Sequence, residues 1–342
     1  KDDLCWEEEQ SPAAKGQLDA PYDTCGSETM RMSLGLLLSV TLLVLAGGYV
    51  MTAGDVEHPV YEHEDYTDED IPRLLSSVDY LMSLPEDDLI DMVPDQSGLY
   101  FVRCPNCEGG RQDNTKFLWD VKEPDQMKCP HCGHVYPSDE YPMEQSVKVE
   151  APSGEIVEYP YWENSDGKRF YFEARHDFIA REWLSNRAMD LAVLYHLTGE
   201  EKYARRSALI INRFAEVFPH YVYKFDFPFR PVKWYEGDVD PADFRGGFRT
   251  SRWDWWAYMD IPAQLVQAYD LIYNSGALEK IEGGKQRIEE QFFLNAAQQV
   301  AANEESLGNM SPVVWQDMII VGRVLGKPDY VHEVVDRLKQ FL

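Results

Sequence analysis

Residues 181–221 read REWLSNRAMDLAVLYHLTGEEKYARRSALIINRFAEVFPHY, and this stretch predicts two helices joined by a tight turn. In its first half an apolar stripe recurs at spacings of four, three and four residues, the period of one helix face: Leu184, Ala188, Leu191 and Tyr195. Gly199 should end the first helix, because glycine readily adopts the left-handed backbone conformation that closes helix C-termini. Pro219 should end the second helix.

The second helix of this stretch has two apolar faces. One face consists of Ala204, Ala208, Ile211 and Ala215, and the other of Tyr203, Ile210, Phe214 and Val217. A helix that is apolar on two sides is usually packed between neighbours. We therefore expect it to lie inside a helical body.

The same turn occurs again near the end of the chain. A tyrosine follows the glycine by four residues in both places, Gly199 with Tyr203 and Gly326 with Tyr330. Helical spacing recurs on both sides of the second turn, in Val314, Met318, Val321 and Leu325 and then in Val331, Val334, Leu338 and Phe341. Recurring helical hairpins indicate a solenoid or a closed (α/α) toroid, and an irregular helical domain is the simpler alternative.

Composition limits the domain count and the class of partner. At ~150 residues per domain, 342 residues correspond to about two domains. The formal net charge of −28 argues against nucleic acid as the main partner, because phosphate binding needs clustered Lys and Arg. The acidic stretch 55–98, whose first 41 residues contain Arg73 as their one base, reads as a solvated and partly disordered lead-in with one or two short helices within 70–92.

The N-terminal region reads as a targeting segment. Residues 1–29 are polar and aperiodic, and translation is expected to begin at Met30 or Met32. A positive charge, the apolar run 34–45 and the small residues that follow are typical of a secretory signal. The apolar run extends to Met51 if it is instead an uncleaved membrane anchor, which needs ~17 residues. Residues 1–54 are thus a spurious leader plus a signal or anchor, and the body of the protein is expected to be secreted or periplasmic.

Two Cys-Pro-x-Cys pairs predict a metal centre. Cys104 and Cys107 form the first pair, Cys129 and Cys132 form the second, and 21 residues separate the pairs. This spacing is typical of a zinc ribbon, in which four thiolates surround one Zn²⁺ and leave no open position for water. The site would therefore be structural rather than catalytic. Two disulfides in an exported protein are the alternative.

These signals divide the folded part in two. Residues 99–172 form a zinc-ribbon-like β segment, with short strands expected at 147–149 and 168–172. Residues 173–342 form the helical body, read as an incomplete (α/α) toroid. The predicted fold is therefore mainly α, preceded by a small β element.

Residues 221–258 form a long aromatic stretch inside the helical body. A loop of this length is usually functional or disordered, and its aromatic density argues against disorder. Aromatic faces pack against sugar rings, and arginine side chains match carboxylates and sulfates. The candidate substrate-binding residues are Arg245, Arg249, Arg252, Trp253, Trp255, Trp256 and Tyr258. The alternative is that the aromatic residues are core between helices.

Asn309 lies in a polar turn just before a helix expected to start at Ser311 and Pro312. An asparagine in this position is most often a local cap. A role in a binding site is the other interpretation.

Taken in order, several of these segments resemble the heparinase II/III-like and alginate lyase polysaccharide lyases. They are residues 181–221, the stretch from Ile261-Pro262 to Tyr273, and Leu307-Gly308-Asn309-Met310 before a helix. The Cys-Pro-x-Cys pairs resemble an insertion seen in some members, so the resemblance spans roughly residues 99–342. It implies an N-terminal toroid followed by a β-sandwich. It also implies β-elimination on a uronate-containing anionic polysaccharide.

The resemblance also assigns residues. It implies that Asn309 is catalytic and helps bind the uronate carboxylate, whereas Met310 departs from the histidine that often follows. The family's usual tyrosine and later histidine would lie beyond Leu342, so the chain is expected to be an inactive N-terminal portion of a lyase.

Two alternatives to a lyase stay open. One is a toroid glycoside hydrolase that uses carboxylates among Asp238, Asp240, Asp254 and Asp260. The other is a glycan-binding toroid without catalysis.

Overall fold

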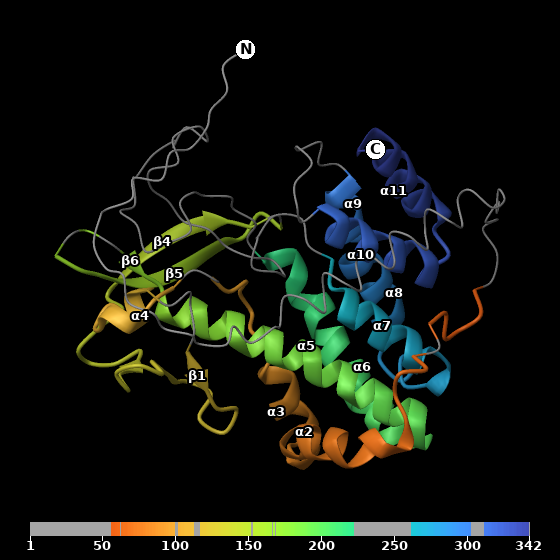
Figure 1. The fold of residues 1–342 in the computed structure, drawn as a ribbon, viewed down its shortest axis with the longest axis horizontal. Helices are drawn as coiled ribbons and strands as arrows, with labels where there is room; N and C mark the ends of the chain where they lie inside the picture. Colours follow the sequence, from red (N-terminus) through yellow and green to blue (C-terminus); the bar gives the residue numbers. More distant parts are fainter. Residues whose placement is uncertain are drawn as a thin grey trace, which may run out of the picture. The chain divides into compact units, whose positions relative to one another are not determined.

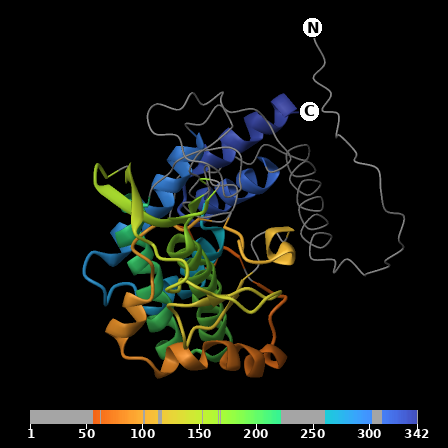
Figure 2. The ribbon, with the colours of Figure 1, turned by 90° about the vertical axis from the view of Figure 1, so that its left-hand side faces the viewer.

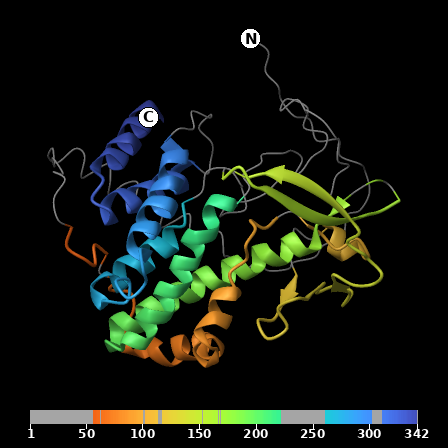
Figure 3. The same cartoon turned by 180° about the vertical axis from the view of Figure 1, so that it is seen from behind.

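Helix α5 (Phe172–Thr198) is the longest of the described helices and packs against four other elements. Helices α2 (Ile71–Ser83), α6 (Glu201–Val217) and α7 (Ala263–Ile272) contact it, and so does strand β5 (Ile156–Glu163) (Figure 1). Seen from behind in Figure 3, α5 runs from the β elements to the turn that leads into α6.

The computed structural model of the chain describes residues 56–61, 63–99, 102–112, 117–151, 153–165, 167, 169–221, 261–301 and 311–341. All of them fall within one unit, Val50–Leu342.

The predicted hairpin of α5 and α6 is confirmed. Gly199 has a φ of 69°, and its N–H donates to the carbonyl of Tyr195 at 2.7 Å, which closes α5. Three of the four residues of the predicted stripe, Leu184, Ala188 and Leu191, are at 0% exposure, and Tyr195 is partly buried. Helix α5 begins at Phe172, one residue before the expected start of the helical body.

Both apolar faces of α6 are buried, as predicted. The residues of the two faces are between 0% and 4% exposed: Tyr203, Ala204, Ala208, Ile210, Ile211, Phe214, Ala215 and Val217. They pack against α5, α7 and the π-helical segment η4 (Arg287–Leu294). It ends at Val217, and the short 3₁₀ turn η2 (Phe218–His220) follows it and contains Pro219.

The second predicted hairpin is also present. Helix α10 (Ser311–Val324) leads into α11 (Pro328–Phe341) through Gly326, whose φ is 61°. Among the described elements these hairpins build a mainly helical body, but they do not show a closed ring. Toroidal closure therefore stays a prediction.

The acidic segment belongs to the helical core. Helices α2 and α3 (Glu86–Asp91) pack against α5 and α6, respectively. Five apolar side chains of this segment are at most 1% exposed: Leu74, Val78, Leu81, Leu89 and Val93. This finding corrects the expectation of a solvated, partly disordered lead-in. The two predicted helices exist. The expectation was wrong because it rested on the number of Asp and Glu residues and did not consider the apolar residues between them.

A short segment before these helices, residues 58–61, is held in place by a buried carboxylate, and we call this segment the strap. Asp270 of α7 accepts hydrogen bonds from the N–H groups of Val60 and Tyr61 at 2.9–3.0 Å and from Nδ1 of His58 at 2.6 Å. The carboxylate is completely buried. The His58 ring stacks on Tyr273 with 3.6 Å between ring centroids. The strap thus supplies donors to a carboxylate that would otherwise be buried alone.

The β elements form two small antiparallel sheets. The first contains β1 (Leu118–Trp119), β2 (Met127–Lys128) and β3 (Val135–Tyr136). The second contains β4 (Gln145–Glu150), the central strand β5 and β6 (Arg169–Phe170). Strands β4 and β6 occupy the two stretches where short strands were predicted. Both sheets face the viewer in Figure 2.

The helical segments after residue 260 include 3₁₀ and π-helical parts. Helix α7 starts at Ala263, directly after Pro262. It ends through the 3₁₀ turn η3 (Tyr273–Ser275), followed by Gly276 with a φ of 74°. Helix α8 (Gly284–Gln286), the π-helical η4 and α9 (Asn295–Ala301) follow it in the chain.

No helix within the described ranges is long and apolar enough to cross a membrane. The predicted signal or anchor lies outside the described residues.

Candidate metal centre

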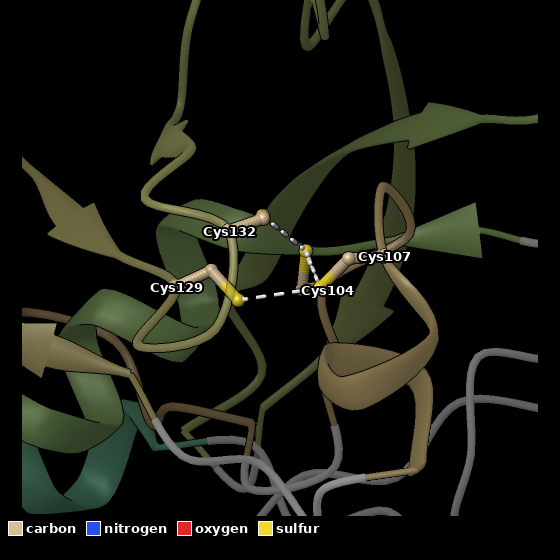
Figure 4. Close-up of side chains that lie close together, drawn as sticks. All are labelled: Cys104, Cys107, Cys129 and Cys132. Atoms are coloured by element: carbon tan, nitrogen blue, oxygen red, sulfur yellow. Dashed lines mark hydrogen bonds between the residues drawn. The ribbon is translucent and has the colours of Figure 1, made fainter.

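The two Cys-Pro-x-Cys knuckles bring their four sulfur atoms together. Cys104 and Cys107 lie just before the short helix α4 (Glu108–Gln112), and Cys129 and Cys132 lie between β2 and β3. All four Sγ atoms lie within 4.8 Å of one another (Figure 4). The two knuckles are at least 22 positions apart in the sequence. Together they form one cluster that could bind a metal ion such as zinc.

The spacing of the sulfur atoms fits a tetrahedral zinc ion. A Zn–S bond of about 2.3 Å implies a sulfur–sulfur edge of about 3.8 Å in a regular tetrahedron. The separation is 3.9 Å for Cys104 and Cys107, 3.7 Å for Cys104 and Cys132, and 3.8 Å for Cys107 and Cys129. A disulfide would need about 2.05 Å. The structure therefore has four free thiols here instead of the two disulfides of the alternative prediction.

Backbone hydrogen bonds shape the second knuckle. The N–H of Cys129 donates to the carbonyl of His134 at 2.8 Å, and the N–H of Gly133 donates to the carbonyl of Cys129 at 3.0 Å. Gly133 has a φ of 75°, in the left-handed region that glycine tolerates best. The glycine directly after Cys132 is thus what allows the chain to turn into β3.

The first knuckle depends on a close approach by α4. The N–H of Gly110 donates to Sγ of Cys107 at 3.1 Å. A Cβ atom at Gly110 would lie 2.5 Å from Cβ of Cys104 and 3.0 Å from Sγ of Cys107. Only a residue without a side chain lets the helix backbone reach the sulfur atoms, so this glycine is part of the site.

A set of polar side chains surrounds the sulfur atoms. The hydroxyl of Tyr136 lies 3.1 Å from Sγ of Cys104, and Asn106 Nδ2 donates to Sγ of Cys132 at 3.7 Å. Asn106 Nδ2 also lies 2.8 Å from Nδ1 of His134, whose Nε2 lies 2.7 Å from a carboxylate oxygen of Glu140. Both nitrogens of His134 are therefore engaged, so this histidine supports the knuckle and is not a fifth ligand. Such outer contacts orient ligands and tune metal affinity.

The thiols differ in how readily they ionise. Burial raises the pKa of Cys104 and of Cys129 above that of an ordinary thiol. Burial acts the same way on Cys132, but hydrogen bonds from the His134 backbone, from Asn106 and from neighbouring thiols outweigh it and lower its pKa to about 6. The pKa of Cys107 is raised as well. Because a metal binds thiolates, Cys104, Cys107 and Cys129 must each lose a proton when the ion enters.

Aromatic rings attach the metal centre to the helical body. The Tyr136 ring stacks on Phe172, the first residue of α5, with 4.3 Å between centroids. Trp119 of β1 lies 5.7 Å from the ring of Trp183 and 6.0 Å from that of His176, both on α5. The first sheet therefore contacts α5 at two places, through β3 and through β1.

The other predicted site residues lie outside the described residues, so their arrangement is not established. They are Arg245, Arg249, Arg252, Trp253, Trp255, Trp256, Tyr258 and Asn309, together with the carboxylates of the hydrolase alternative, Asp238, Asp240, Asp254 and Asp260. Helix α10 does begin at Ser311, two residues after Asn309, as expected.

The sequence predicted the four-cysteine cluster but not its surroundings. Asn106 lies inside the first knuckle and could have been found from that position alone. Tyr136 and Gly110 had no comparable signal, because their roles depend on how β3 and α4 pack against the sulfur atoms.

The chain matches no protein-family model, no curated protein and no solved structure. The four-cysteine cluster is therefore the feature from which the function of the described part has to be argued.

Proposed function

We propose that Cys104, Cys107, Cys129 and Cys132 hold one structural zinc ion. The observation that carries this proposal is the set of sulfur separations of 3.7–3.9 Å, which match the edges of a ZnS₄ tetrahedron. Tetrahedral S₄ sites select zinc or iron–sulfur chemistry, and a mononuclear S₄ site on two knuckles is typical of zinc. With four thiolates bound, the ion has no position for substrate or water.

The role of the ion follows from what surrounds it. The three strands of the first sheet are two residues long each, which is too short for a stable sheet in water. A metal that joins the two knuckles supplies the missing stability, because its binding energy becomes folding energy. The ion would thereby hold Tyr136 and Trp119 in place against α5.

We further propose that the protein is a lyase that acts on uronate-containing polysaccharides. This proposal rests on the order of segments that resemble the heparinase II/III-like and alginate lyases. It is supported by the two helical hairpins, α5–α6 and α10–α11, which lie in the order that the resemblance implies. In β-elimination a proton leaves the carbon next to the uronate carboxylate and the glycosidic oxygen departs. Negative charge therefore grows on the carboxylate, which needs hydrogen-bond donors directed at it.

Residues of the chain have separate tasks in this proposal. Asn309 donates to the carboxylate, and Arg245, Arg249 and Arg252 bind neighbouring anionic groups. A protein with a net charge of −28 must concentrate positive charge locally to attract an anionic polymer. The base and the acid are expected in the β-sandwich region that follows the helices in the resembling family.

Binding and product analysis test the polysaccharide proposal. Affinity electrophoresis in gels that contain alginate, heparan sulfate or chondroitin sulfate should retard the protein, and a gel with neutral dextran serves as the control. Elimination leaves an unsaturated uronide that absorbs in the ultraviolet, whereas hydrolysis does not. Equal mobility in all gels would contradict the proposal, and binding without any product in an extended chain would favour the glycan-binding alternative.

A further inference from the structure

The four thiols of the metal centre differ sharply in accessibility. Cys104 and Cys129 are 2% and 1% exposed, Cys107 is half-buried, and Cys132 is exposed. Sγ of Cys132 lies 3.7 Å from Sγ of Cys104 (Figure 4). A solvent-borne reagent can therefore reach one sulfur directly, and that sulfur lies beside a buried one from the other knuckle.

We propose that this centre is a peroxide-sensitive zinc clamp, in which hydrogen peroxide oxidises Cys132, Cys104 forms a disulfide with it, and the zinc ion leaves. This inference rests on the proposed zinc site. The predicted export of the protein gives it a context, because oxidants reach proteins more readily outside the reducing cytoplasm.

The chemistry balances in two steps. The Cys132 thiolate attacks one oxygen of peroxide, the O–O bond breaks, and sulfenic acid and hydroxide form. The Cys104 thiolate then attacks the Cys132 sulfur, an S–S bond forms, the S–O bond breaks, and a second hydroxide leaves. Two thiolates are oxidised by two electrons in total, and one peroxide is reduced.

The geometry favours Cys104 as the resolving thiolate. Its sulfur needs to close the 3.7 Å gap to a bond length of about 2.05 Å, which requires a small rotation of side chains. Cys107 instead accepts the N–H of Gly110 at 3.1 Å, which holds that sulfur on the α4 side. The resulting disulfide joins the two knuckles, so they stay covalently linked after the metal ion has left.

Loss of the metal follows from the number of remaining ligands. Cys107 and Cys129 are left, with their sulfur atoms 3.8 Å apart, and two thiolates cannot fill a tetrahedral site. The change also reaches α5. The Cys104 sulfur turns toward Cys132 and away from the hydroxyl of Tyr136, whose ring stacks on Phe172.

The test uses the zinc-loaded chain, hydrogen peroxide and a chromogenic zinc chelator. We expect about one zinc ion to be released per peroxide consumed, and mass spectrometry should find a Cys104–Cys132 disulfide. Cys132→His is the matched variant, because Cys₃His zinc sites are common and histidine has no sulfur to oxidise. Its zinc should be released at least about tenfold more slowly. Cys104→His keeps Cys132 and should accumulate sulfenic acid there, trapped with dimedone.

Several outcomes would overturn the inference. Zinc release at an unchanged rate from Cys132→His would do so, and so would a first disulfide between Cys129 and Cys132. Dimedone trapping on the unaltered protein provides a test that needs no variant, and labelling that does not fall first on Cys132 is a further contradiction. A chain that contains no zinc would refute the proposed metal site itself. Zinc that is bound but resists peroxide would refute this inference alone.

Discussion

The hydroxyl of Tyr136 lies 3.1 Å from Sγ of Cys104, while the ring of the same tyrosine stacks on Phe172 with 4.3 Å between centroids. One side chain thus touches both a cysteine of the candidate metal centre and the first residue of α5, the longest described helix. The tyrosine is completely buried, so neither contact is shared with water. The metal centre and the helical body are therefore joined through this residue.

Replacing Tyr136 should separate these two contacts. Tyr136→Phe keeps the ring stack and removes the hydroxyl, so we expect zinc affinity to fall about tenfold with little change in Tm. Tyr136→Ala also empties the space beside Phe172 and should cost about 3–5 kcal/mol of stability. Competition with a chelator measures the first effect, and denaturant unfolding measures the second. Tyr159→Phe, a buried tyrosine bonded to Ser97, is the control and should leave zinc affinity unchanged.

Zinc binding should strengthen as pH rises. Burial raises the pKa of the Cys104 and Cys129 thiols, so these groups hold protons in the metal-free protein at neutral pH. Each must lose its proton to bind the ion, and protons therefore compete more strongly at lower pH. Calorimetric titration at several pH values should show proton release, together with one zinc per chain and four free thiols after zinc removal. A pH-independent affinity would contradict this mechanism.

Asp270→Asn should destabilise the protein strongly. The change replaces one of the two acceptor oxygens of a buried carboxylate. That carboxylate accepts hydrogen bonds from the N–H groups of Val60 and Tyr61 and from Nδ1 of His58. It also directs an amide NH₂ at these donors. We expect a loss of about 3 kcal/mol in the free energy of unfolding, with the strap released first. Proteolysis near residue 60 reports the release, and the exposed Asp65→Asn should behave like the unaltered protein.

His63 should make the protein sensitive to mild acid. Burial lowers its pKa below 6.5, and the nearby His196 acts in the same direction, whereas Asp270 and Asp65 oppose it. The unfolded chain therefore binds the proton more tightly, so stability is full above about pH 6.5 and falls as pH drops toward the folded-state pKa. His63→Asn removes this titration and suits the positive φ of 46°. Unfolding curves between pH 5 and 8 should be flatter for the variant, and identical slopes would exclude the effect.

In a chain that shows lyase activity, Asn309→Ala distinguishes catalysis from helix capping. A donor to the developing carboxylate charge should lower kcat about 10²–10³-fold and change KM little. A mere cap of α10 should instead cost ~1 kcal/mol of stability with normal turnover. Arg249→Ala or Arg252→Ala should mainly raise KM and weaken its dependence on salt. Normal kcat with a lower Tm in Asn309→Ala would rule out the catalytic role.

The sequence by itself determined the features that depend on residues close together in the chain. The spacing of four and three residues between Leu184, Ala188 and Leu191 predicted the buried face of α5, because a helix repeats every 3.6 residues regardless of what it packs against. Gly199 predicted the end of that helix through its own backbone preference. The two Cys-x₂-Cys pairs predicted the metal ligands, because the knuckle spacing already contains the local geometry that a tetrahedral ion requires.

The tertiary structure alone decided which distant segments meet. Asp270 receives hydrogen bonds from residues more than 200 positions earlier, and no local pattern indicates that pairing. The same is true of Tyr136. Its hydroxyl contacts Cys104 and its ring contacts Phe172, and both contacts require β3 to lie beside the start of α5. The acidic run was misjudged for this reason too. Whether Leu74 faces water or a core depends on the presence of α5 beside it, since burial is a property of the neighbours and not of the residue.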